Sequence, residues 1–279
     1  MIRRAAFLGA PPELATVLQW SARIGYAARG AVYVGLGAMA FLAALDLTPR
    51  AKGAREVLET WAAWPLGGVL IVIVAAGLVG FAVWRGVQAL FDADRHGTTL
   101  KGWAIRSGQA LSGLVYGGLA WSALELLDVF EDVGEADETQ SAHQYAEAIL
   151  GWPGGDRILV VAGLIVLGFG IGNVIQGLMQ DFAKRLSCDA DTCARVVPLA
   201  KIGYAARGLA TLPLGAFLVV AGLEVRASQA RSWGDALQVV EQQPAGPWIL
   251  GLVALGLVAF GLFGFVEALS RRIRPPAAL

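Results

Sequence analysis

Long apolar segments alternate with polar connections along this chain. Six of these segments reach the length of about 20 mostly apolar residues that crosses the hydrocarbon core of a bilayer as an α-helix. They cover residues 25–45, 66–84, 106–127, 158–179, 204–223 and 248–267. The pattern therefore predicts six transmembrane helices and an all-α membrane protein.

The connection inside each successive pair of apolar segments carries a short stretch of mixed polarity. These stretches are Ala54–Ala63, Ser141–Leu150 and Trp233–Gln242. In the first of them the apolar residues Val57, Leu58 and Trp61 recur at helical spacing. We therefore predict short amphipathic helices on the outer face, each lying in the membrane interface with its apolar side toward the lipid.

The chain also repeats itself. The phrase Ile-Gly-Tyr-Ala-Ala-Arg-Gly at 24–30 returns unchanged at 202–208, and a weaker copy, Ser-Gly-Gln-Ala-Leu-Ser-Gly, lies at 107–113. The second segments of the pairs align as well, through Gly80-Phe81, Gly168-Phe169 and Ala259-Phe260. Recurrence at this spacing indicates one structural unit used three times. Because each unit crosses the membrane twice, all three share one orientation.

We divide the chain into an N-terminal segment (1–19), repeat one (20–100), repeat two (101–186), repeat three (187–270) and a tail (271–279). The simplest arrangement of three tandem helical hairpins is a quasi-threefold bundle. A linear row of hairpins is the alternative, and it has the same topology.

The repeated phrase, opening a span in a chain of three two-helix copies, resembles the bacterial domain-of-unknown-function 1206 family. The resemblance covers roughly residues 20–270. It implies an integral membrane protein of this architecture and implies no reaction. The second copy departs from the phrase, with Gln109 in place of Tyr and Ser112 in place of Arg.

Composition and charge agree with a membrane protein. Charged residues make up 16% of the chain, against about 25% in soluble domains. With the N-terminus in the cytoplasm, 16 of the 22 Lys and Arg residues fall on the cytoplasmic side. The positive-inside rule thus predicts cytoplasmic N- and C-termini, and we expect a multi-pass protein of the bacterial inner membrane. The apolar stretch after Arg4 is too short for a cleaved signal peptide. Because the basic residues are dispersed among short loops, we expect no nucleic-acid partner.

The first span of each repeat carries small and hydroxyl residues on one face. In repeat one this face has Tyr26, Gly30, Tyr33 and Gly37. Such a face is typical of a helix-packing seam. The alternative hypothesis is a ring at one depth that lines a narrow vestibule, formed by Tyr33, Tyr116 and Thr211.

Two arginines of the repeated phrase lie near the cytoplasmic ends of their spans. We expect Arg29 and Arg207 to reach the interface as anchors that bind lipid phosphates. Tyr26 and Tyr204 stand three residues earlier, which allows a cation–π contact. A specific anion or headgroup site between repeats is the functional alternative.

Polar residues also end the second spans. Gln88, Gln176 and Glu267 occupy equivalent positions, and Asn173 lies one turn deeper than Gln176. We interpret all four as donors or acceptors of interhelical hydrogen bonds. A proton or cation path is the alternative, but such a path needs more buried carboxylates.

The remaining candidates for chemistry are weak. The acidic loop at 128–138 lacks the spacing of a calcium loop. Cys188 and Cys193 do not match zinc-knuckle spacing, and we expect free thiols in a reducing cytoplasm. Asp92, Asp94 and His96 suggest a polar turn. With two histidines in the chain and no nucleotide loop, we expect neither catalytic residues nor a bound metal or cofactor.

Two functional hypotheses follow. The first is a non-catalytic membrane protein that organises lipids, or partner membrane proteins, through its small-residue seams and basic cytoplasmic rim. The alternative is a small channel or transporter with a path along the axis between the repeats.

Overall fold

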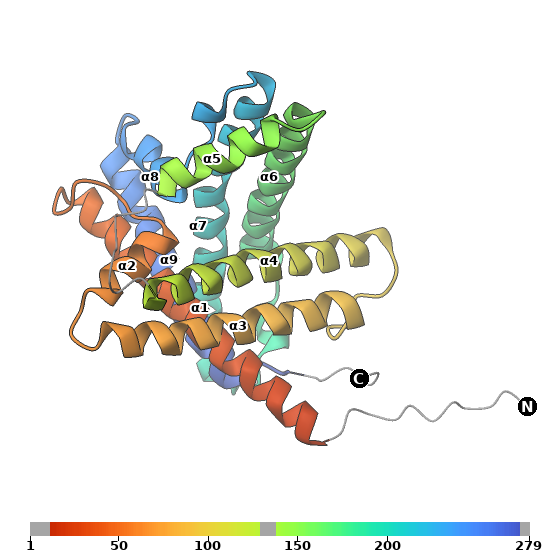
Figure 1. Ribbon diagram of the computed structural model, residues 1–279. Helices are drawn as coiled ribbons and strands as arrows, with labels where there is room; N and C mark the ends of the chain where they lie inside the picture. Colours follow the sequence, from red (N-terminus) through yellow and green to blue (C-terminus); the bar gives the residue numbers. More distant parts are fainter. Residues whose placement is uncertain (1–11, 129–137, 274–279) are drawn as a thin grey trace, which may run out of the picture.

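The computed structural model describes residues 12–128 and 138–273, and the described chain is helical. The helices are α1 (Pro12–Ala44), α2 (Ala54–Ala62), α3 (Gly67–Phe91), α4 (Leu100–Asp128), α5 (Glu138–Leu150), α6 (Gly155–Met179), α7 (Ala190–Leu223), α8 (Trp233–Glu241) and α9 (Gly246–Ser270), with 3-10 turns η1 (Phe182–Arg185) and η2 (Ala227–Gln229) (Figure 1). The first residues, which we interpreted as an uncleaved N-terminus, and most of the acidic loop lie outside the described residues.

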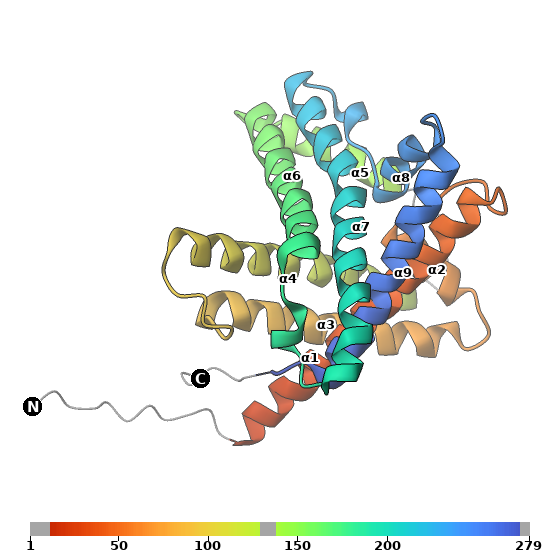
Figure 2. The ribbon, with the colours of Figure 1, turned by 180° about the vertical axis from the view of Figure 1, so that it is seen from behind.

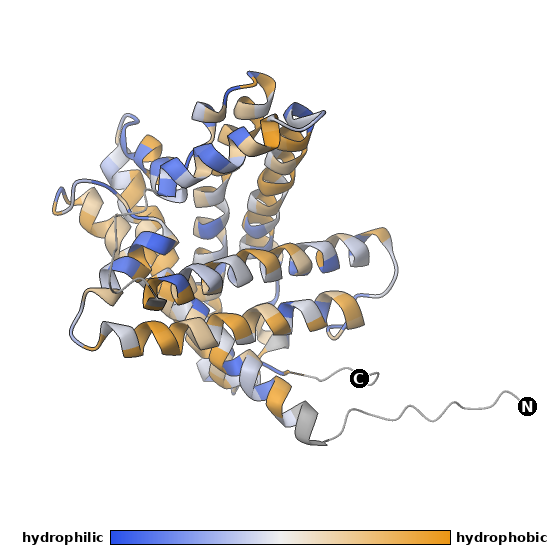
Figure 3. Ribbon diagram, in the orientation of Figure 1, coloured by the Kyte–Doolittle hydropathy of each residue, from blue (hydrophilic) through white to orange (hydrophobic). Residues whose placement is uncertain are grey.

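In the part of the chain that the structure describes, six helices are long and apolar enough to cross a membrane: α1, α3, α4, α6, α7 and α9. Hydrophobic residues dominate them, whereas α5 and the loops are more hydrophilic (Figure 3). This confirms the six predicted spans. The second span of each repeat begins after the same left-handed turn, at Leu66 (φ 67°), Gly154 (φ 77°) and Ala245 (φ 62°).

Short helices occupy the three amphipathic stretches, but their predicted contact with lipid is not confirmed. In α2, Val57 and Leu58 are fully buried and Trp61 is 9% exposed. A methyl group added to Gly35 of α1 would lie 2.6 Å from the side chains of Val57 and Trp61. The apolar face of α2 therefore packs on the protein itself, because the small Gly35 lets it approach α1 closely.

Neighbouring repeats pack through equivalent helices. The second span of one repeat packs on the first span of the next, as α3 on α4, α6 on α7 and α9 on α1. A methyl group on Gly30 would lie 2.7 Å from the carbonyl oxygen of Gly261, and one on Gly208 would lie 2.5 Å from that of Gly170. At the third junction, a methyl group on Gly113 would lie 3.3 Å from the carbonyl oxygen of Ala82. The predicted small-residue seam is thus confirmed at these positions.

Packing within the repeats is not equivalent. In repeat one α1 packs on α3, and in repeat three α7 packs on α9. Among the described residues, α4 and α6, the spans of repeat two, show no comparable packing. The pair α3 and α4 runs across the direction of α6 and α7 (Figures 1 and 2). The predicted quasi-threefold bundle is therefore not confirmed, because its second hairpin is open.

Side-chain size accounts for this opening. A methyl group on Gly25 would lie 2.6 Å from the backbone nitrogen of Phe81, and one on Gly203 would lie 2.6 Å from that of Phe260. The equivalent Gly108 in repeat two has no such neighbour within 4 Å. One turn further along, repeat two carries Leu111 and Ile165 where the closed hairpins pair alanine with glycine. Repeat two therefore lacks the pair of small residues through which the closed hairpins bring their backbones together.

Candidate functional site

A buried carboxylate joins the first and third repeats. Glu267, near the end of α9, is 3% exposed. Its Oε2 accepts a hydrogen bond from Arg29 Nη2 of α1 at 2.5 Å, and its Oε1 accepts one from Arg271, one turn later. Because both arginines are also buried, this carboxylate balances charge that solvent does not screen.

Arg29 is held inside the protein. Its side chain is 1% exposed, and its guanidinium lies over the rings of Tyr26, Phe81 and Phe260 at 5.1, 5.1 and 4.8 Å from their centroids. The predicted contact with Tyr26 is confirmed. The prediction that Arg29 reaches the interface is wrong, because an ion pair and three aromatic faces replace the water that a snorkelling arginine would seek.

Arg207 is buried in the same way but lacks a carboxylate. It is 7% exposed; Nε donates to Tyr33 Oη at 2.8 Å, and Nη1 donates to Asn173 Oδ1 at 3.5 Å. The rings of Phe169 and Phe260 lie 4.9 Å from its guanidinium. No acidic side chain of the described ranges pairs with it. The prediction of an interface anchor is wrong here too, since neutral acceptors and aromatic faces hold the side chain inside.

Tyr204 does not form the cation–π contact that we expected with Arg207. Its ring instead packs against Phe182 and Phe260, both with centroids 5.0 Å away. The two copies of the repeated phrase thus differ in how their tyrosines are used, because η1 brings Phe182 against Tyr204.

The three residues of the hypothetical hydroxyl ring are all buried. Tyr33 Oη accepts from Arg207, and Thr211 Oγ1 donates to the Arg207 carbonyl oxygen at 2.8 Å. Tyr33 packs edge-on against Phe260 and Tyr116 against Phe81, at centroid distances of 4.6 and 4.8 Å. These contacts are those of a packed interior. An open vestibule here stays a prediction.

The polar residues at the ends of the second spans have different surroundings. Gln88 is fully buried and Gln176 is exposed. Asn173 is buried; its Nδ2 donates to the Phe169 carbonyl at 2.8 Å, and its Oδ1 accepts from Arg207. The predicted interhelical hydrogen bonds are confirmed for Glu267 and Asn173. Gln88 bonds instead to the loop that follows α3, and exposed Gln176 does not join the buried network because its hairpin is open.

Asp94 in the α3–α4 loop extends the charge network toward the surface. Its Oδ2 accepts from Gln88 Nε2 at 2.7 Å and from Gln109 Nε2 at 3.1 Å. Arg271 Nη2 lies 3.7 Å from the same oxygen. A continuous chain of polar contacts thus runs from Arg29 through Glu267 and Arg271 to Asp94. Sequence analysis treated Asp94 only as part of a polar turn.

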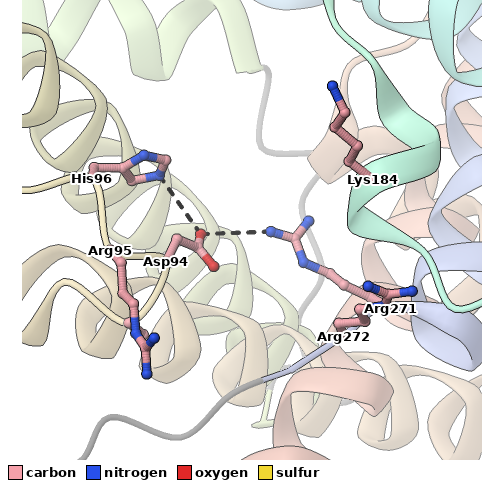
Figure 4. Close-up of a pocket in the computed structure, with 7 residues that line it drawn as sticks. Asp94, Arg95, His96, Lys184, Arg271 and Arg272 are labelled. Atoms are coloured by element: carbon pink, nitrogen blue, oxygen red, sulfur yellow. Dashed lines mark ion pairs between the residues drawn. The ribbon is translucent and has the colours of Figure 1, made fainter.

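The shape of this loop comes from Asp92. This residue has a left-handed backbone (φ 50°), and its carboxylate accepts from the backbone N–H groups of His96 and Gly97, both at 2.7 Å. Although slight burial opposes it, these two hydrogen bonds lower the pKa of Asp92. The ionised side chain therefore folds the loop back on itself. In this loop Asp94 and His96 point toward each other, whereas Arg95 points away from them (Figure 4).

A cavity of about 190 Å³ lies beside this loop, and Figure 4 shows the side chains that line it. It is lined by Ala93, Asp94, Arg95, His96, Lys184, Arg271 and Arg272. We call it the basic pocket, because four of its residues are cationic and one is acidic. Burial opposes the charge of Arg271, but Tyr26, Glu267 and Asp94 outweigh it and raise its pKa. The lining residues come from three segments that are distant in the sequence, so no local motif predicts the pocket.

The segment after η1 fixes the two arginines of the pocket. Leu186 forms an antiparallel bridge with Arg271, and Ser187 N donates to the Ser270 carbonyl oxygen at 2.7 Å. Cys188 and Cys193 follow, and they form a disulfide with Cα atoms 5.6 Å apart. Our expectation of free thiols is therefore wrong in this structure, because the first turn of α7 brings the cysteines within bonding distance.

Comparisons with known proteins agree with the repeat architecture. The family model described as Domain of Unknown Function (DUF1206) matches residues 24–92, 107–180 and 202–271. The chain is 30% identical over 254 residues to "Uncharacterized protein YxxB" of Bacillus subtilis (strain 168), covering 90% of each chain. No solved structure shows significant similarity. With three matched repeats and six membrane-length helices, this chain belongs to the DUF1206 family of membrane proteins.

Proposed function

We propose that this protein binds anionic, phosphate-bearing lipid headgroups in the basic pocket and so organises anionic lipids in the inner membrane, without catalysis. The observation that carries the proposal is that Arg95, Lys184, Arg271 and Arg272 all line one cavity. The first of these comes from the loop before α4, the second from η1, and the last two follow α9. Repeats one and two and the segment directly after repeat three therefore contribute to the pocket.

Arg271 already pairs with Glu267 and Asp94, whereas Arg272 and Lys184 have weaker partners that a ligand could replace. Arg272 Nε donates to the neutral hydroxyl of Ser187 at 3.0 Å. Lys184 is 82% exposed, and its one ion pair within residues 12–128 and 138–273 is with Asp181, itself 52% exposed. Solvent makes this interaction weak. Arginine guanidinium groups can donate two parallel hydrogen bonds to a phosphate. A phosphate would therefore interact more strongly with Arg272 and Lys184 than their present partners, Ser187 and Asp181, do.

The location fits a membrane headgroup. The pocket lies just beyond the ends of α3, α6 and α9, at the level where the chain leaves its apolar helices. By the Lys/Arg bias this is the cytoplasmic side, whose leaflet is rich in anionic lipids. Basic residues at such a surface attract anionic lipids by about 1 kcal/mol each.

Lipid retention by the purified protein tests this proposal. Native mass spectrometry would compare bound phosphatidylglycerol with bound phosphatidylcholine, first for the wild type and then for Lys184→Gln with Arg272→Gln. We expect a preference for phosphatidylglycerol that falls about 30-fold in the double variant, from about 2 kcal/mol lost for two charges. Lys101→Gln is the matched control, because this exposed lysine lies at the same end outside the pocket. Equal retention of both lipids by the wild type would refute the proposal.

One observation favours a second candidate, an anion channel. Arg207 lies buried between repeats without a carboxylate partner in the described ranges, so the interior attracts anions. Anion flux through reconstituted liposomes that is lost on Tyr33→Phe with Thr211→Val would support conduction. The edge-on packing of Tyr33 and Tyr116 against phenylalanines instead favours a closed interior and lipid binding.

A further inference from the structure

We propose that one intact anionic phospholipid occupies the open hairpin of repeat two, with its phosphate in the basic pocket and its acyl chains between α4 and α6. This inference rests on the proposed function and deepens it by naming the ligand class and the place of the chains. The inference depends on one difference between the repeats: the hairpin of repeat two is open, and those of repeats one and three are closed.

The first step is that the inner face of repeat two is exposed where the other repeats bury theirs. Val32 of α1 is 1% exposed, and its equivalent Val115 of α4 is 60% exposed. Ile165 of α6 is 53% exposed, whereas its equivalents Gly77 and Gly256 are buried in closed hairpins. The residues that close the other repeats are therefore left as an apolar surface.

The second step is that open space accompanies this surface. Atoms added to Gly108 of α4, or to Gly168 and Gly172 of α6, would meet no neighbour within 4 Å. At the equivalent of Gly108, closed hairpins bring a phenylalanine backbone into contact with Gly25 and Gly203. Repeat two therefore has unoccupied space beside α4 and α6 at positions where a neighbouring helix packs in repeats one and three.

The third step is continuity with the basic pocket. Arg95 and His96 lie in the loop immediately before α4, and Lys184 lies in η1, just after α6. The pocket therefore sits at the end of the same two helices that stand apart. The apolar faces of α4 and α6 match the acyl chains of an anionic phospholipid, and the basic pocket at their ends matches its phosphate.

The occupant is more readily a lipid than a partner helix. Closely packed helices in this chain meet through glycine and alanine, as at Gly30 with Gly261. The open hairpin instead presents Leu111 and Ile165 at the level where Ala28 meets Gly77. Flexible acyl chains fit between such branched side chains, since they carry no backbone polar groups that need partners.

A variant that restores the small pair tests the inference. Leu111→Ala with Ile165→Gly should let α4 and α6 close, which spin labels on the two helices would report as a shorter distance. We expect phosphatidylglycerol retention to fall by about tenfold or more, while binding of glycerol 3-phosphate, which has no acyl chains, stays unchanged. Leu124→Ala with Ile158→Gly is the matched control, because both side chains are exposed on the same two helices and lie outside residues 108–118 and 165–172.

Photo-crosslinking of the wild type gives a second readout that does not depend on how the variant folds. A phosphatidylglycerol with a diazirine in its acyl chain should label residues 108–118 and 165–172 preferentially. Labelling spread evenly over the spans, or undiminished lipid retention by a closed variant, would overturn the inference and leave the proposed function standing. Crosslinking of this face to a helix of a second copy would overturn it in favour of a protein partner. Failure of the wild type to discriminate phosphatidylglycerol from phosphatidylcholine would instead remove the proposed function itself.

Discussion

Replacing Glu267 by glutamine changes the side chain little in size, but it should lower the free energy of unfolding substantially. The substitution keeps the shape of the side chain and removes the charge that Arg29 and Arg271 share. Arg29, at 1% exposure, cannot reach water to recover solvation. Removing one partner of a buried ion pair costs about 3–5 kcal/mol. Because one carboxylate serves two guanidinium groups here, we expect a loss of about 4 kcal/mol.

Such a loss is a large part of the total stability of a typical domain, about 5–15 kcal/mol. It can be measured by reversible unfolding in mixed detergent and SDS micelles, comparing the wild type, Glu267→Gln and the control Gln176→Ala. Gln176 occupies the equivalent position of repeat two and is exposed, so its loss should cost less than about 0.5 kcal/mol.

A compensating variant separates charge from packing. Arg29→Met with Glu267→Leu removes the buried pair together, and such replacements are often neutral or stabilising. Arg271 would keep its contact with Asp94. We expect this double variant to recover at least half of the stability lost in Glu267→Gln. A Glu267→Gln protein within about 1 kcal/mol of the wild type would refute the view that this carboxylate holds repeats one and three together.

Three further predictions concern other parts of the molecule. Burial, followed by nearby Glu and Asp side chains, raises the pKa of Glu138 to about 7. The contribution of protonated Glu138 to stability is therefore present at low pH and lost as the pH rises through about 7. Thermal unfolding should show that Glu138→Gln stabilises the protein at about pH 8 by an amount on the order of 3 kcal/mol and has little effect near pH 4. Gly25→Leu should destabilise repeat one by about 3 kcal/mol or more while Gly108→Leu is tolerated, because only Gly25 faces a backbone at 2.6 Å; equal losses in SDS unfolding would contradict the open hairpin. Alkylation without reductant should label neither Cys188 nor Cys193, and their joint replacement by serine should cost about 2 kcal/mol; two labelled thiols in the purified protein would count against the disulfide.

Much of the architecture could be predicted from the sequence, because its signals are local. Span length and the repeated phrase depend on neighbouring residues, and so do the glycines of the seams. The position of Arg29 could not be predicted in this way. Near a span end it has the sequence context of a snorkelling side chain, and only the three-dimensional packing brings Glu267, 238 positions later, beside it.

The open hairpin of repeat two could have been predicted from the sequence by comparing residue sizes between the repeats. Leu111 and Ile165 replace an alanine and a glycine of the repeat plan, and their added volume at a close contact indicates separation. The basic pocket had no comparable signal. Its cationic residues come from three loops distant in sequence, and only the way these loops end their helices brings them to one cavity.

The pairing of Arg29 with Glu267 also has a consequence for biogenesis. During synthesis the arginine enters the membrane with the first span, and its counter-ion arrives only with the last. Until α9 is inserted, no acidic side chain of the described residues before it pairs with Arg29. Arg23 likewise lacks the carbonyl oxygens of Ala268 and Leu269 until then. A chain truncated before α9 would therefore lack both the carboxylate that binds Arg29 and the carbonyl oxygens that bind Arg23.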